Sequence, residues 1–116
     1  MIDLFELDVY KLSELLPDLV WNEYDERPNI AKKTIGYKII RSVDSIAANI
    51  AEGYGRYTPG ERKLFYRYAR GSFGETKCWL RKAIRRKIIV ESNVRKFTEM
   101  INELGPKLNA FIKSTK

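Results

Sequence analysis

Apolar residues recur every three or four positions along almost the whole chain, which is the period of an amphipathic α-helix. Four segments show it, at about residues 8–23, 30–52, 59–86 and 91–113. The two-residue alternation of strands is absent, and neither Asn-Gly nor Asp-Gly occurs as a hairpin turn. The pattern therefore predicts an all-α protein with four helices and three short connections.

Local signals support these boundaries and add two irregularities. Thr58, Pro59 and Glu61 form a capping box, in which Thr58 is the N-cap of the third helix. Pro17 lies inside the first helix and predicts a kink or a split, because proline removes a helical N–H and crowds the preceding turn. Pro106, after a glycine, predicts a bend in the fourth helix.

Each segment has one apolar face. In the second helix this face consists of Ile35, Ile39, Val43, Ile46 and Ile50. The expected faces of the first and third helices are Val9, Leu12, Leu15, Leu16, Leu19 and Val20, and Phe65, Tyr68, Ala69, Ser72, Thr76, Trp79, Leu80 and Ala83. The fourth repeats Val94, Phe97, Ile101, Leu104, Leu108 and Phe111. Four such helices with short loops predict an antiparallel up-down four-helix bundle, as one domain over residues 1–116.

Composition narrows the function classes. The chain of 116 residues contains no histidine, which removes the commonest metal ligand and general base. Its one cysteine, Cys78, cannot form an internal disulfide and fits a reducing cytosol. No apolar run approaches the roughly 18 residues that cross a membrane. We therefore expect a cytoplasmic protein that is not an enzyme and uses no metal or cofactor.

Charge is distributed unevenly along the chain, whose net charge is +7. Residues 1–30 carry eight acidic and two basic side chains, whereas residues 31–90 carry fifteen basic and four acidic ones. Such a dipolar chain suggests one basic surface, for a polyanion or for the acidic segment of a neighbouring copy.

Six cations of the third helix share one side of it, and we call them the basic stripe: Lys63, Arg67, Arg70, Lys77, Arg81 and Arg85. They fall within an arc of roughly 80° over about 33 Å of helix, opposite the expected apolar face, and Gly74 alone interrupts the row. Solvated helix faces usually mix charges of both signs, but this arc has no acid. Nucleic-acid phosphates are the anions that suit it best; pairing with acidic residues of the first helix or another subunit, and plain solubility, are the alternatives.

Two further clusters have competing interpretations. Residues 53–57, Gly-Tyr-Gly-Arg-Tyr, form either a loop that stacks bases and brings Arg56 to a phosphate, or a helix-stop loop whose tyrosines pack onto the bundle end. Polar residues on apolar faces, which are Asn49, Glu52, Ser72 and Glu75, predict a buried network between the second and third helices. Glu75 could pair there with Arg41 or Arg56. A carboxylate metal site is the alternative, but the further carboxylates or Glu-x-x-His that it needs are missing.

Residues 45–56, Ser-Ile-Ala-Ala-Asn-Ile-Ala-Glu-Gly-Tyr-Gly-Arg, are followed by Arg-Gly-Ser-Phe-Gly-Glu at residues 70–75. This combination resembles the bacterial four-helix-bundle family of proteins encoded in intervening sequences of 23S ribosomal RNA genes, which also includes the Avd accessory proteins of diversity-generating retroelements. The resemblance implies a ring-shaped homopentamer. Its retroelement branch implies a basic surface that binds nucleic acid and a reverse transcriptase as partner. The motif does not separate the two branches.

The sequence leads to two functional hypotheses. The first is an oligomeric accessory protein that binds RNA or DNA phosphates through the basic stripe, with Arg56 as a weaker contributor. The second is a scaffold that docks an acidic protein without binding nucleic acid directly.

Overall fold

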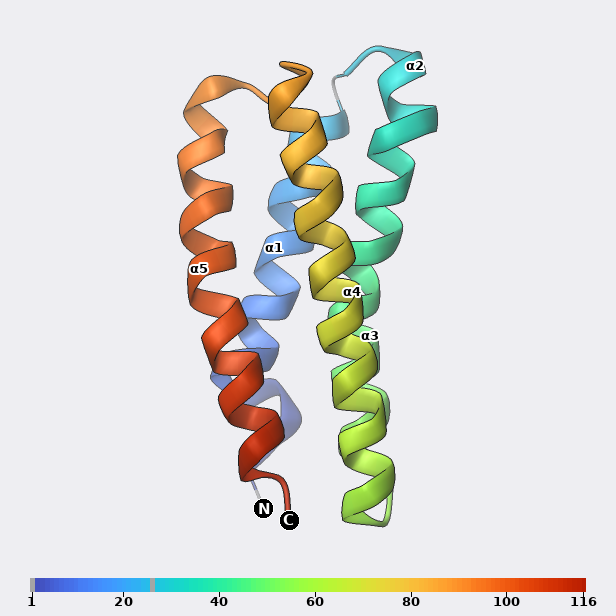
Figure 1. Ribbon diagram of the computed structural model, residues 1–116, viewed down its shortest axis with the longest axis vertical. Coiled ribbons are helices and arrows are strands. Elements are labelled where there is room, and N and C mark those ends of the chain that lie inside the picture. The colour runs from blue at the N-terminus through green and yellow to red at the C-terminus, as the bar shows by residue number, and fades with distance from the viewer. Residues whose placement is uncertain (1, 26) are drawn as a thin grey trace.

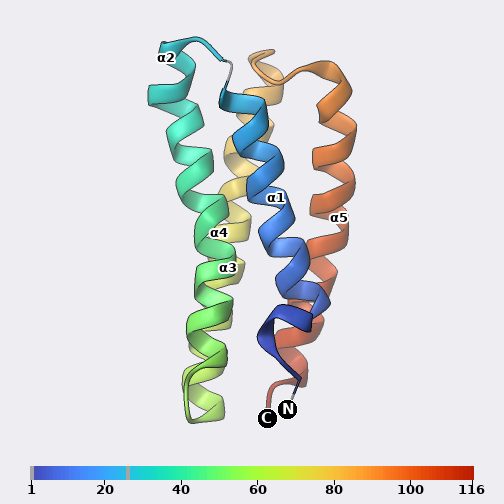
Figure 2. The ribbon, with the colours of Figure 1, turned by 180° about the vertical axis from the view of Figure 1, so that it is seen from behind.

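Four long helices run up and down beside one another in the computed structural model, which describes residues 2–25 and 27–116 (Figure 1). They are α1 (Asp8–Asp25), α3 (Tyr37–Tyr54), α4 (Pro59–Arg85) and α5 (Glu91–Ser114), and a short 3-10 turn, η1 (Leu4–Glu6), precedes them. Each long helix packs against two antiparallel neighbours, in the cyclic order α1, α3, α4, α5 (Figure 2). The described residues contain no strand. The predicted four-helix bundle is therefore confirmed.

The second predicted helix begins with two short segments, α2 (Asn29–Ala31) and the π-helical η2 (Lys32–Gly36), which lead directly into α3. The Thr34 hydroxyl donates to the Ile30 carbonyl at 2.6 Å, so it competes with the backbone N–H that normally binds there. A Cβ at Gly36 would lie 2.9 Å from both the Ala31 carbonyl oxygen and the Tyr24 ring. The widened turn thus depends on a competing hydroxyl and a close approach, which periodicity alone does not predict.

Both internal prolines are accommodated within continuous helices. α1 passes through Pro17 and α5 passes through Pro106 without a break, so the predicted possibility of a split at Pro17 is wrong. The glycine before Pro106 has a packing role, because a Cβ at Gly105 would lie 3.2 Å from the Phe73 ring of α4.

The buried core agrees best with the predicted apolar faces in α3, where every expected apolar residue is buried. Two assignments are wrong: Leu15 of α1 is 57% exposed, and Tyr68 of α4 is 51% exposed. The buried residues of α4 are Tyr66, Ala69, Phe73, Thr76, Leu80 and Ala83. Aromatic residues occur on several sides of α4, so the sequence pattern does not identify its buried face uniquely. The predicted face is rotated about the helix axis relative to the face that is buried.

Specific groups close the helix ends. The Thr58 hydroxyl accepts from the Glu61 N–H at 3.2 Å, which confirms the predicted N-cap of α4. At the start of α5, the buried Glu23 carboxylate of α1 accepts from the Val90 N–H and from the Asn93 amide. These ends fix the lengths and the relative heights of α4 and α5, which carry the candidate site.

Candidate nucleic-acid interface

The basic stripe lies along α4, as its spacing predicts. Arg67, Arg70, Lys77, Arg81 and Arg85 are exposed and Lys63 is half-buried. A Cβ built at Gly74, within the row, would meet nothing within 4 Å. The row is therefore open to a ligand over its whole length.

The stripe lies beside the buried face of α4 rather than opposite it. At about 100° per residue, the centres of the two faces are roughly 110° apart. The stripe turns toward α5, because Lys77, Arg81 and Arg85 share a groove with residues of that helix. The prediction that the cations oppose the core is wrong because it rested on the misplaced apolar face.

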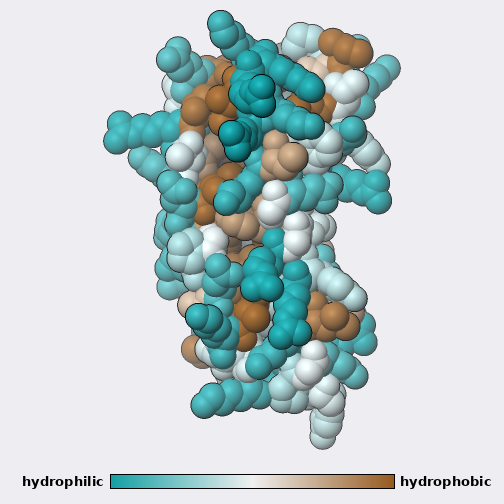
Figure 3. Space-filling view, in the orientation of Figure 1, coloured by the Kyte–Doolittle hydropathy of each residue, from teal (hydrophilic) through white to brown (hydrophobic). Residues whose placement is uncertain are grey.

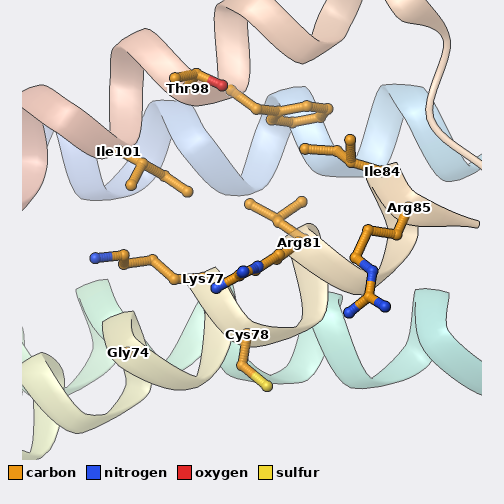
Figure 4. Close-up of a pocket in the computed structure, with 10 residues that line it drawn as sticks. Gly74, Lys77, Cys78, Arg81, Ile84, Arg85, Thr98 and Ile101 are labelled. Atoms are coloured by element: carbon orange, nitrogen blue, oxygen red, sulfur yellow. The ribbon is translucent and has the colours of Figure 1, made fainter.

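A groove of about 440 Å³ separates the second half of α4 from the first half of α5, and we call it the α4–α5 groove. Its apolar lining comes from Leu80, Ile84, Phe97 and Ile101. Figure 4 shows Lys77 and Arg81 along its α4 side, with Ile101 across from them on α5. The space-filling view shows a hydrophobic furrow between these helices, surrounded by hydrophilic surface (Figure 3).

None of the six cations is in an ion pair within the described part of the chain. The pairs found there are Arg56–Glu52, Arg95–Glu99 and Lys107–Glu103, and each joins two residues one helical turn apart. Of the six cations, Lys77 alone contacts an aromatic ring among the described residues, with its amine 5.7 Å from the centre of the Phe73 ring. The stripe thus keeps its charge available to a partner.

Other kinds of site find less support among residues 2–25 and 27–116. No group of three or more Cys, Asp or Glu is placed there to hold a metal ion. No helix in this part of the chain is both long enough and apolar enough to cross a membrane.

Comparison with known proteins places the chain in a family. The model of the 23S rRNA-intervening sequence proteins matches residues 5–110. The chain belongs to this family. Curated proteins yield no match.

A solved structure supports the assignment to the 23S rRNA-intervening sequence proteins. It is a protein of unknown function from the S23 ribosomal protein family of Bacteroides thetaiotaomicron, 25% identical to this chain. The similarity has a TM-score of 0.82 and covers 91% of this chain and 96% of the other.

The segments that resemble the family have mainly structural roles in this chain. Arg56 pairs with Glu52, and its guanidinium lies 4.5 Å from the centre of the Phe65 ring. Tyr54 is half-buried and donates to the Ile2 carbonyl, whereas Tyr57 is 91% exposed. The helix-stop interpretation thus describes Tyr54 and Arg56, and Tyr57 alone of the two tyrosines points into solvent.

In the same segment, glycine is required because it has no side chain, and not because of an unusual backbone conformation. α3 ends at Tyr54 with Gly55 as its C-cap, so the helix stop lies within the predicted loop, but no glycine in the described residues has a positive φ. A Cβ at Gly53 would lie 2.6 Å from the Tyr66 ring. Gly53 is needed because α3 and α4 approach each other closely there.

The polar network between α3 and α4 is real, but its members differ from the predicted ones. Ser45 donates to Ser72, and the Thr76 hydroxyl lies 2.9 Å from the Ser42 hydroxyl. Of the predicted members, only Ser72 takes part. Short hydroxyl side chains fit where two helices are close. Ser42 and Ser45 were not distinguished in the sequence from ordinary polar positions, and Thr76 was assigned only to the apolar face of the third helix.

The other predicted members bind within their own helices. Asn49 donates to the Ser45 carbonyl at 2.8 Å, Glu52 pairs with Arg56, and Glu75 accepts from the Trp79 indole at 3.2 Å. The expected pairing of Glu75 with Arg41 or Arg56 is absent from the described contacts. Exposed polar side chains find partners one turn away, so they need no partner across the interface.

A second cavity, of about 590 Å³, lies on the α3 side of α4 and was not foreseen. Lys38, Arg41, Glu75 and Trp79 contribute to its lining. The Lys38 amine lies 4.6 Å from the Trp79 ring centre and the Lys82 amine 5.0 Å from it. These cations extend the positive surface around α4 beyond the basic stripe. In the sequence, the spacing of Lys38 and Arg41, one helical turn apart, is the feature that could have indicated this second basic area.

Acidic groups lie on the other side of the bundle. Burial, together with the nearby Asp18 carboxylate, raises the pKa of Asp44 on α3. Two carboxylates from α1 and α3 therefore reinforce one another's negative potential away from the stripe.

Proposed function

We propose that the protein is a non-enzymatic accessory protein that binds RNA or DNA through the basic stripe. The observation that carries the proposal is the row of six cations on α4, without a carboxylate partner among the described residues. Guanidinium groups match phosphate oxygens in a fork geometry, and phosphates recur along a strand whatever its sequence. The family is named for an intervening sequence of 23S rRNA, which makes RNA the first ligand to test.

The proposal includes assembly into a homo-oligomeric ring, for which a pentamer is the expected form. Its support is the resemblance of residues 45–56 and 70–75 to ring-forming proteins, together with the opposed net charges of the acidic first 30 residues and of α4. A ring would repeat the stripe around an axis, so several weak phosphate contacts would act together on one strand.

Charge reversal tests the binding surface. The triple variant Arg70→Glu/Lys77→Glu/Arg81→Glu should lose RNA retention in a filter-binding assay, because it replaces attraction by repulsion at the centre of the stripe. Its helical circular dichroism should match that of the wild type, since all three side chains are exposed.

The matched control is Lys11→Glu/Lys33→Glu/Lys96→Glu, which changes the net charge equally at exposed sites off α4. It should keep most of the wild-type affinity. Equal losses in both variants would reduce the effect to net charge and remove the assignment of the stripe.

A scaffold that docks an acidic protein, such as a reverse transcriptase, is the second candidate. It is favoured by exposed apolar residues of α4, Leu64 and Tyr68, which a nucleic-acid backbone would not require. It predicts a stoichiometric protein complex that survives nuclease treatment, whereas binding through RNA predicts that nuclease dissolves the complex.

A further inference from the structure

The α4–α5 groove combines two chemistries that a simple phosphate-binding row does not need. Ile84 and Ile101 are partly exposed in it, and the nearly buried Leu80 and Phe97 lie among them. Phosphates contact cations and gain nothing from aliphatic surface. The apolar lining therefore points to a ligand that has an apolar face as well as a negative charge.

We infer that this groove takes an unstacked base of single-stranded RNA while Lys77 and Arg81 bind the adjoining phosphates. The inference rests on the proposed function and narrows it to a class of nucleic acid. Every base has an apolar face, and proteins that bind single strands combine a cationic track with aromatic side chains on which bases stack. In this groove the partly exposed apolar side chains are aliphatic, Ile84 and Ile101, so the base would pack against them.

The dimensions of the groove favour a base. Its volume of about 440 Å³ lies within the range of small-ligand sites, roughly 300–1,000 Å³. Lys77 and Arg81 are one turn apart, which places their backbones about 6 Å apart along the helix axis. This spacing lets two cations follow successive phosphates of one extended strand.

A duplex would not use the groove in this way. Its bases are stacked and paired inside the helix, so only its phosphates would reach α4. The charge of the groove favours RNA over an uncharged apolar helix as the occupant. Cations line its α4 side, and the residues of its α5 side, which include Thr98 and Ile101, have no carboxylate that would neutralise them. A single strand satisfies both the apolar and the charged parts.

The first experiment varies the ligand and leaves the full chain intact. Fluorescence anisotropy compares a uridine oligonucleotide with an abasic oligonucleotide of the same length and the same number of phosphates. The base-bearing strand should bind about fivefold more tightly, because the base buries apolar surface against the groove. The two strands should show the same dependence on salt, because they release the same counterions.

The second experiment locates the effect. Ile101→Ala should bring the affinity for the uridine strand down toward that for the abasic strand and leave the latter unchanged. Ile40→Ala is the matched control, because Ile40 of α3 is also partly buried against the core but lies outside the groove. It should preserve the difference between the strands.

The outcomes distinguish base binding in the groove from phosphate binding by the basic stripe. Equal binding of both strands overturns the inference and leaves phosphate binding by the stripe in place, while failure of both strands to bind overturns the proposed function itself. A difference between strands that Ile101→Ala does not reduce places the base elsewhere and also overturns the inference.

Discussion

Lys87 has φ of 57°, a left-handed conformation that favours glycine. It follows Arg86, the C-cap of α4. The Lys87 N–H donates to the Ile84 carbonyl and the Ile88 N–H donates to the Ala83 carbonyl, both at 3.0 Å. These two bonds form a Schellman motif, in which glycine is the usual residue at this position. The turn therefore holds lysine at a cost in conformational energy.

Replacing Lys87 with glycine should stabilise the protein by about 1 kcal/mol, because the steric cost of the left-handed conformation disappears. The measurement is the free energy of unfolding in urea. Lys87→Ala is the control, since it removes the same charge but keeps the Cβ. A gain of equal size in both variants would assign the effect to charge and not to the backbone.

Asp44 predicts a dependence of stability on pH. Burial and Asp18 raise its pKa above the ordinary 3.8, so the folded protein binds more protons than the unfolded chain just above that value. The contribution of Asp44 to stability therefore falls as the pH rises through this window. Asp44→Asn should stabilise the protein near pH 7 and have little effect near pH 3, in urea unfolding at matched ionic strength. An equal gain at both pH values would contradict this origin.

The start of α5 depends on a side chain from another helix. Val90 is its N-cap and offers no side-chain cap; the buried carboxylate of Glu23 instead accepts from the Val90 N–H and from the Asn93 side-chain amide. A negative group at this position also interacts favourably with the helix dipole. Helix α5 is in this way joined to the end of α1, about 70 residues earlier in the chain.

Glu23→Gln should lower the free energy of unfolding by roughly 1–3 kcal/mol, because an amide leaves one buried donor without its charged acceptor. Thermal and urea unfolding both measure the change. Glu99→Gln, at an exposed acid that pairs with Arg95 on α5, should cost no more than about 0.5 kcal/mol. Similar losses in the two variants would mean that Glu23 has no special role as a cap.

The elements of this fold were predictable where local chemistry decides them. Spacing and residue type alone predict the four helices, the Thr58 cap and the apolar face of α3. The π-helical turn, the Glu23 cap and the role of Gly53 depend on contacts with distant residues, so no local pattern reveals them. The sequence also did not reveal that Pro17 is accommodated within a continuous helix.

The candidate site was predictable to the same extent. Regular spacing identified the six cations, because like charges on one helix face are visible in the sequence. Arg56 was predicted as a weaker contributor; its pair with Glu52 is one turn away along the chain, but its contact with Phe65 arises only when α3 and α4 come together. The predicted bundle places α4 and α5 side by side, but the groove between them depends on how their side chains pack, which the sequence pattern does not show.

The whole molecule measures 44 × 23 × 20 Å, and its long axis follows the helices. A stripe of about 33 Å therefore covers most of one side of the bundle. Acidic residues of α1 and Asp44 lie away from it, so two copies could attract each other through these opposite charges. Self-association of that kind and phosphate binding would compete for the same cations.

This competition makes the mass of the assembly informative. If the stripe binds nucleic acid in the assembled ring, other surfaces must form the subunit contacts, and Arg70→Glu/Lys77→Glu/Arg81→Glu should sediment with the wild-type mass while losing RNA. If the stripe instead docks on α1 of a neighbour, the same variant should fall apart into monomers, and added RNA should dissociate the wild-type protein. We expect the first result in analytical ultracentrifugation, because the proposed function leaves the exposed cations of the stripe free for phosphates in the assembled ring.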